Sequence, residues 1–141
     1  MRIFFYLFIL LFLNITTTIS AGELKINVTN IENNIGSIHY ALYNDPSVFP
    51  DEEGKIHGGN KRVNEVVANG ILIKELNESY YAVAIYHDEN ANKKFDTFLS
   101  IPKENYGFSN NAPVFFGPPS FEDAAVFVKQ NNTTEIEIEL R

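Results

Sequence analysis

The chain has 141 residues, is 45% hydrophobic and contains no cysteine, and its formal net charge at pH 7 is −7. This length fits one domain with its own core, and the lack of cysteine excludes disulfides and thiol catalysis. The acidic balance gives no electrostatic support for binding nucleic acid or an anionic membrane, so we predict no nucleic-acid partner.

The first 20 residues have the three parts of a secretory signal peptide. Arg2 supplies the positive charge, residues 3–13 form an apolar run, and residues 14–21 are small or polar except for two isoleucines. The run is shorter than the roughly 18–20 residues needed to cross a bilayer. We predict a signal peptide over residues 1–20, with a cut after Ser20 or one residue later.

Cleavage would leave an exported domain over residues 22–141 that is periplasmic or secreted. Residues 1–20 contain one arginine and no acidic residue, so their removal makes the net charge −8. No second apolar run of that length follows, and we predict no membrane span in the mature chain. The alternative is an uncleaved N-terminal anchor.

Short strands dominate the first half of the mature chain. Apolar and polar residues alternate over 24–28, and the same period of two recurs over 36–43, which indicates half-buried strands. Residues 44–60 hold two prolines and three glycines among charges and predict a long loop. Residues 63–68 fit a short strand or one helical turn, and a further strand includes residues 71–73.

Residues 80–86 are the most buried candidate strand. We predict that Tyr81, Val83 and Ile85 share one buried face. The same core should contain three side chains of the earlier strand, namely Ile38, Tyr40 and Leu42.

The last part of the chain predicts an irregular stretch followed by two strands. Residues 100–120 are rich in Asn, Pro and Gly, which favours loops. Residues 124–128 predict a strand, and residues 136–140 predict an edge strand with Glu137 and Glu139 toward solvent. Six or seven short strands without a strong helix predict an all-β fold, a single small antiparallel β-sandwich.

The segment after the buried strand has the spacing of a cation-binding loop. Four oxygen-bearing side chains fall at positions 1, 3, 5 and 9 of this loop: Asp88, Asn90, Asn92 and Asp96. Alternate side chains of a turning loop can converge, and calcium takes several oxygen ligands at about 2.3–2.6 Å. An EF-hand needs Gly at position 6 and Glu at position 12, where this chain has Lys93 and Leu99.

Two interpretations of this loop stay open. In the first, the four side chains bind calcium with a dissociation constant of roughly 10⁻⁴–10⁻³ M, because Lys93 and Lys94 offset their two negative charges. In the second, the Asp and Asn side chains cap the turn by accepting from backbone N–H groups.

Histidines and serine offer little evidence for catalysis. A zinc or copper site would need two or three of His39, His57 and His87 to converge. Ser109, His87 and Asp96 could be assembled into a triad on paper, but no nucleophile elbow is visible. We therefore predict that the protein is not an enzyme, with a small hydrolase as the least favoured alternative.

An aromatic stretch over residues 106–119 is the second candidate site. Tyr106 and Phe108 could stack on a ligand, and the amides of Asn110 and Asn111 could hydrogen-bond it. Loops longer than roughly 12–15 residues in small domains are often functional. The alternative is a structural plug, in which the aromatic rings close one end of the sandwich.

Four segments together resemble a bacterial exported family, the domain of unknown function 2141. They are Tyr-Ala-Val-Ala-Ile-Tyr-His-Asp-Glu-Asn over 81–90, Asp96-Thr97, Ile-Pro-Lys-Glu-Asn-Tyr-Gly-Phe-Ser-Asn-Asn over 101–111, and Pro-Ser-Phe-Glu-Asp-Ala over 119–124. The resemblance implies a small envelope or secreted β-sandwich, similar in outline to transthyretin-like, carboxypeptidase-regulatory-like or immunoglobulin-like domains. It implies no particular activity. In that family a glycine is usual near position 91 or 93, where this chain has Ala91 and Lys93.

Three function classes follow from these patterns. We predict an exported binding or accessory module of the bacterial envelope, stabilised by calcium if the loop binds an ion, with a protein or glycan as its partner. Such a module requires a concave, aromatic-lined surface near residues 106–116. A structural component of an envelope assembly would instead expose an edge strand that pairs with a partner. A hydrolase would need His87 beside a carboxylate in a pocket.

Overall fold

A computed structural model describes residues 20–141, so the predicted signal peptide lies outside the described residues except for Ser20. The elements in chain order are β1 (Gly22–Thr29), β2 (Ser37–Tyr43), β3 (His57–Arg62), α1 (Val63–Asn69), β4 (Ile71–Leu76), β5 (Ser79–Asp88), β6 (Thr97–Phe98), β7 (Ile101–Pro102), β8 (Tyr106–Phe108), α2 (Phe121–Ala124), β9 (Val126–Val128) and β10 (Thr133–Glu139). Short 3₁₀ turns cover Glu52–Gly54 and Ser109–Asn111. In this part of the chain no helix has the length and apolar character to cross a membrane.

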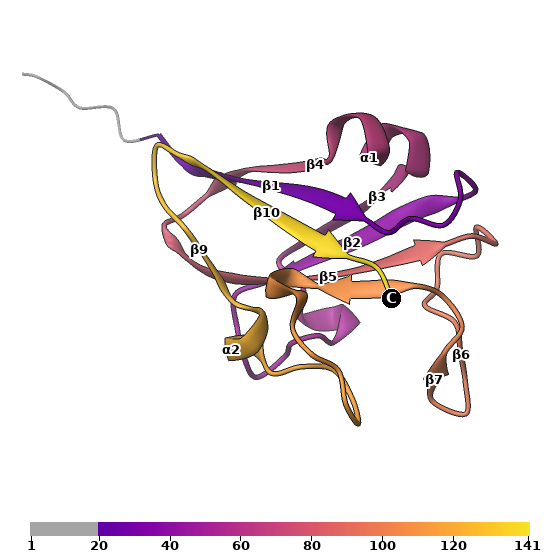
Figure 1. The fold of residues 1–141 in the computed structure, drawn as a ribbon. Coiled ribbons are helices and arrows are strands. Elements are labelled where there is room, and N and C mark those ends of the chain that lie inside the picture. The colour runs from indigo at the N-terminus through magenta and orange to yellow at the C-terminus, as the bar shows by residue number, and fades with distance from the viewer. Residues whose placement is uncertain (1–19) are drawn as a thin grey trace, which may run out of the picture.

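The strands form two packed layers, as Figure 1 shows. One sheet has the order β10-β1-β4, and the other has the order β3-β2-β5-β8, with β9 paired to the first residues of β5. The predicted all-β sandwich is therefore confirmed. Its pairs are antiparallel except for β1 and β10, which run parallel. These two strands lie at opposite ends of the described chain, so no hairpin dictates their direction.

Alternating side chains from both sheets meet between the layers and form the core. The fully buried members include Leu24, Ile26, Ile38, Leu42, Ile71, Val83 and Ile138. Burial of each such side chain contributes about 1.5–3 kcal/mol. The predicted face of Tyr81, Val83 and Ile85 is confirmed, whereas Tyr40 is half-buried at the margin of this core.

The ambiguous segment 63–68 is the helix α1. Val63 and Val66, three residues apart, turn the same face inward and are buried. The helix ends at Gly70, which has φ of 68° and donates its N–H to the Val66 carbonyl. A side chain at Gly70 would lie 2.6 Å from the Ile26 carbonyl oxygen, so this turn requires glycine.

Two predicted loops contain strands. Residues 57–60 belong to β3, and residues 101–102 and 106–108 form β7 and β8, so the predictions of continuous loops over 44–60 and 100–120 are wrong there. β3 has no hydrophobic alternation because it is an exposed edge strand, placed by its pairing with β2. The strand predicted from residue 124 begins at Val126, after α2. The predicted edge strand is confirmed as β10, with its glutamates exposed.

Candidate functional site

A groove of about 1090 Å³ lies on the outer face of the five-stranded sheet. Since Val83 and Ile85 point into the core, their neighbours in β5 point outward, and the same alternation applies to β2. We call this hollow the aromatic groove. Its floor is formed by outward side chains of β2, β5 and β8, namely His39, Ala41, Ala84, Tyr86, Tyr106 and Phe108.

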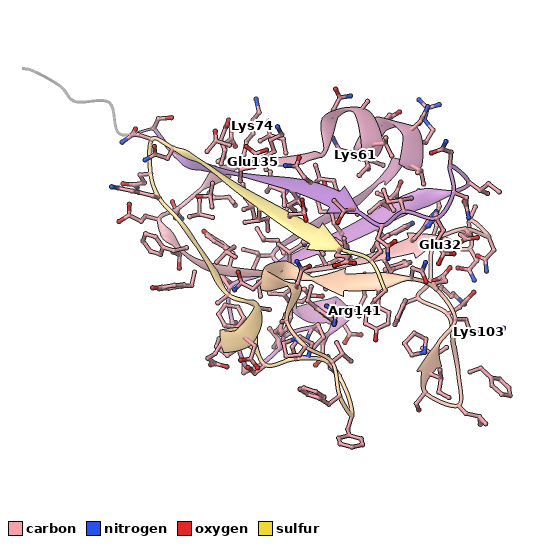
Figure 2. The ribbon with its side chains drawn as sticks, viewed as in Figure 1. Glu32, Lys61, Lys74, Lys103, Glu135 and Arg141 are labelled. Atoms are coloured by element: carbon pink, nitrogen blue, oxygen red, sulfur yellow. The ribbon has the colours of Figure 1, made fainter. Side chains whose placement is uncertain are left out.

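Two projections flank the aromatic groove, and both extend from the same side of the molecule (Figure 1). One is the β6–β7 hairpin, and the other is the loop over residues 112–119. Figure 2 shows Lys103 beside the hairpin, whereas Lys74 and Glu135 lie on the opposite layer. Large apolar side chains cover both projections and face solvent: Phe98, Leu99 and Ile101 on the hairpin, Phe115 and Phe116 on the loop.

The aromatic rings along the groove form a continuous row. His39 stacks on Tyr86 at a centroid distance of 4.7 Å, and Phe95 lies 5.4 Å from Tyr86 and 5.7 Å from Tyr106. Tyr106 is in turn 6.0 Å from Phe108. Such edge and stacked contacts fix the rings against one another, so the apolar surface is preformed.

The tip of the β6–β7 hairpin has an unusual residue for its backbone. Thr97 pairs with Pro102 and Phe98 with Ile101, which leaves Leu99 and Ser100 as a two-residue turn with φ of 50° and 66°. Turns with both φ values positive favour Asn and Gly. Leu99 is 81% exposed, so the core gains nothing from it. Neither core packing nor the turn geometry therefore accounts for the apolar residue at this exposed tip.

The other half of the outer face is closed by a second apolar cluster. Its buried members are Tyr43, Ala82, Phe108, Ala112, Phe121 and Ala124, with Phe49 packed against them. The Asn110 side-chain amide donates to the Ala125 carbonyl at 2.7 Å, and Asn111 Oδ1 accepts from the Glu139 N–H at 2.8 Å. Of the four predicted binding residues, Tyr106 and Phe108 line the groove, whereas these two asparagines hold backbone in place.

The three residues of the hypothetical triad have other partners. Ser109 Oγ accepts from the Val83 N–H at 2.8 Å and donates to the Ala124 carbonyl. His87 Nε2 lies 2.7 Å from the Ile35 carbonyl oxygen. The structure therefore does not bring the Ser109 hydroxyl to His87.

The predicted cation loop folds around the carboxylate of Asp88, which is fully buried at the end of β5. Asp88 Oδ1 accepts from the Asn92 N–H at 3.2 Å, and Oδ2 accepts from the Lys93 N–H at 2.8 Å. The amides of Asn90 and Asn92 both donate to the Asp96 carboxylate, at 2.7 and 2.9 Å. These bonds hold the pKa of Asp96 below its ordinary value. The four predicted residues thus share one network.

Glu104, which sequence reasoning missed, joins this network from a separate segment. It is only 8% exposed, and its Oε2 accepts from the Asp96 N–H at 3.1 Å. Burial raises the pKa of Glu104, and the nearby carboxylates of Asp88 and Asp96 raise it further. Glu104 lies in the segment of the family resemblance, but neither periodicity nor loop spacing singles it out.

Two residues of the loop carry backbone strain. Ala91 and Lys93 have φ of 58° and 61°, in the left-handed region where glycine is favoured. The family resemblance implies a glycine near one or the other of these two positions. His39 Nε2 lies 3.2 Å from Asp88 Oδ2, so the loop adjoins the His39 end of the aromatic groove.

The fold and groove together define a small β-sandwich protein with an open aromatic face. The chain belongs to the family described as uncharacterized protein conserved in bacteria (DUF2141), whose model matches residues 26–137. The comparisons find no matching curated protein and no matching solved structure.

Proposed function

We propose that the protein is an exported binding module whose aromatic groove holds an apolar polypeptide segment of a bacterial envelope partner. The observation that carries this proposal is the cluster of solvent-facing apolar side chains on the two projections beside the groove. Such exposure has no role in the core of a monomer, and patches of this kind mark sites of interaction. The preformed row of rings lowers the entropic cost of binding.

The chemistry of the lining favours a polypeptide over a glycan. On the two projections the side chains of Ile101, Val114 and Phe116 offer no hydrogen-bonding groups to sugar hydroxyls, while polar side chains such as Lys55 and Asn60 lie elsewhere along the groove. On another side the groove is bordered by Gly58 and Gly59 of β3, the outer strand of its sheet. An edge strand presents backbone N–H and C=O groups, to which an extended peptide can add as a further strand.

Binding, with no catalytic step, also agrees with the hydrogen bonds of the polar candidates. Ser109 and His87 are engaged by backbone groups, and both are fully buried. In this proposal Ser109 therefore has a structural role, in which its hydroxyl joins β5 to the segment that contains Ala124.

Peptide display against the immobilised protein tests the proposed ligand. The parent should enrich apolar and aromatic peptides. The double variant Phe115→Ser/Phe116→Ser should bind these peptides at least tenfold more weakly, and it should still fold, because both rings are exposed and lie outside the core. Leu72→Ser is the matched control, since Leu72 is an exposed apolar residue on β4 of the other sheet. Equal binding by the double variant, or selective binding in a glycan array with no peptide enrichment, would overturn the proposal.

Export is the second part of the proposal. The signal-peptide pattern of residues 1–20 supports it, and the first strand, β1, begins at Gly22. Mass spectrometry of the protein from the periplasm or medium should find an N-terminus at Ala21 or Gly22. A chain that keeps its first residues in the membrane fraction would indicate the uncleaved anchor.

A structural component of an envelope assembly is the second candidate, favoured by the exposed edge of β3. In that case purified protein should self-associate, and sedimentation would show species that grow with concentration. A monomer at all concentrations that binds peptide would support the binding module.

A further inference from the structure

The unsatisfied polar atoms of the described residues gather at the end of β5. Three buried side-chain atoms make no hydrogen bond of good geometry there. His39 Nε2 lies 3.2 Å from Asp88 Oδ2, His87 Nδ1 lies 3.8 Å from Glu89 Oε1, and the third atom is Glu104 Oε1. They lie on or beside the strand end that carries Asp88. Buried polar groups are nearly always satisfied by protein, water or an ion, so Glu104 Oε1, which has no such carboxylate or N–H group opposite it, points to a ligand.

Glu104 is the most informative of the three. More than nine-tenths of the residue is buried, one oxygen is held against the loop by the Asp96 N–H, and the other has no partner. An unpaired buried carboxylate beside Asp88 and Asp96 is unfavourable, because like charges repel and desolvation penalises each. A bound cation removes both costs.

We propose that Asp88, Asn90, Asn92, Asp96 and Glu104 form a calcium site in which Glu104 closes the loop from outside. All five residues offer oxygen, the ligand atom that calcium prefers, and a third carboxylate offsets the charge of the two nearby lysines. Rotation of the two asparagine amides by half a turn would direct their oxygens toward Asp96, and it would release the N–H groups of Asn92 and Lys94 that these oxygens now accept.

Binding must include a rearrangement of the loop. Within residues 20–141, no three His, Cys, Asp or Glu side chains are already placed to hold a metal ion. Residues 89–95 are exposed, although Phe95 contacts Tyr86 and Tyr106, and movement of this segment would let Asp88 and Asp96 at its two ends approach an ion. The cost of this movement keeps the dissociation constant in the roughly 10⁻⁴–10⁻³ M range of extracellular modules.

The site would tie together two parts of the aromatic groove. Phe95 is in the loop, and Glu104 precedes β8 by two residues, so one ion would fix both Phe95 and Tyr106. The effect on the groove rests on the proposed function, whereas calcium binding to the loop does not depend on it. The metal alone is therefore a sufficient probe.

Calorimetric titration with calcium chloride tests the ligands. The parent should bind one calcium, and Glu104→Gln should weaken binding at least tenfold, although the amide oxygen can still accept from the Asp96 N–H. Glu89→Gln is the matched control, because it removes one adjacent negative charge from a residue outside the proposed set; its affinity should change less than threefold. Asp96→Asn, at a half-buried position, serves as a second variant if Glu104→Gln does not fold.

Each other outcome overturns the site. No binding by the parent would leave only a self-capped turn, an unchanged affinity in Glu104→Gln would remove Glu104 from the ligands, and equal losses in both Gln variants would indicate general electrostatics. Terbium gives an independent readout, because the chain has no tryptophan and Tyr86 lies near these carboxylates. Excitation of tyrosine should sensitise terbium emission that calcium quenches by competition. Tyr86→Phe should weaken the emission while calcium still binds, because Tyr106 also lies near the site.

Discussion

The two faces of the five-stranded sheet contrast sharply although they belong to the same strands. On the inner face Ile38, Leu42 and Val83 are fully buried against the other sheet. On the outer face His39 and Tyr86 form the floor of a groove between projections that expose their apolar side chains. Since the second apolar cluster covers only part of the outer face, the aromatic groove stays open to solvent.

The comparison also separates two kinds of apolar residue. Inner-face residues stabilise the fold because they leave water on folding. Phe115 and Phe116 are just as apolar, but they remain exposed to water in the folded chain and add nothing to this hydrophobic stabilisation. Substitutions on the two surfaces should therefore differ in their effect on stability.

The largest effect is expected for the inner face. Ile85→Ala should lower the free energy of unfolding by about 2–4 kcal/mol, because it removes buried methyl groups and leaves a cavity. Phe115→Ala should change the same quantity by less than about 0.5 kcal/mol. Urea unfolding of both variants measures the difference. Similar losses in the two proteins would show that the loop over 112–119 packs on the fold and is not a free projection.

Ser109→Ala should have the next largest effect. The hydroxyl joins the Val83 N–H to the Ala124 carbonyl, so its removal leaves two buried backbone groups unsatisfied at a cost of about 1–3 kcal/mol. Ser120→Ala is the control, because Ser120 accepts the Asp123 N–H at the exposed start of the short helix α2. Thermal denaturation in the same buffer should rank Ser109→Ala as the less stable variant, and the reverse order would contradict this role of Ser109.

The inner face could be predicted from the sequence because alternation directly records which side of a strand is buried. It identified β1, β2, β5 and β10, including the face of Tyr81, Val83 and Ile85. β3 was not predicted, because an exposed edge strand does not need alternating apolar residues. Its strand conformation is defined by its pairing with β2.

The candidate sites were only partly accessible to sequence reasoning. Spacing found the four loop residues because they are local in the chain, whereas Glu104 depends on a hydrogen bond to Asp96 across a hairpin. Composition identified the aromatic stretch of Tyr106 and Phe108. It could not show that Asn110 and Asn111 turn toward the backbone of other segments.

The smallest expected effect concerns the strained loop beside the groove. Ala91→Gly should raise the free energy of unfolding by up to about 1 kcal/mol, because glycine adopts a positive φ without the steric cost that alanine has. The gain is partly offset by the greater freedom of glycine in the unfolded chain. Ala68→Gly should instead lower the free energy of unfolding. This exposed alanine belongs to α1, and glycine in a helix costs about 0.5–1 kcal/mol. Urea unfolding in the presence of chelator measures both variants without a contribution from calcium. A loss of stability in Ala91→Gly equal to that in Ala68→Gly would show that the left-handed conformation at residue 91 carries no strain, and glycine would then have no energetic advantage in the loop.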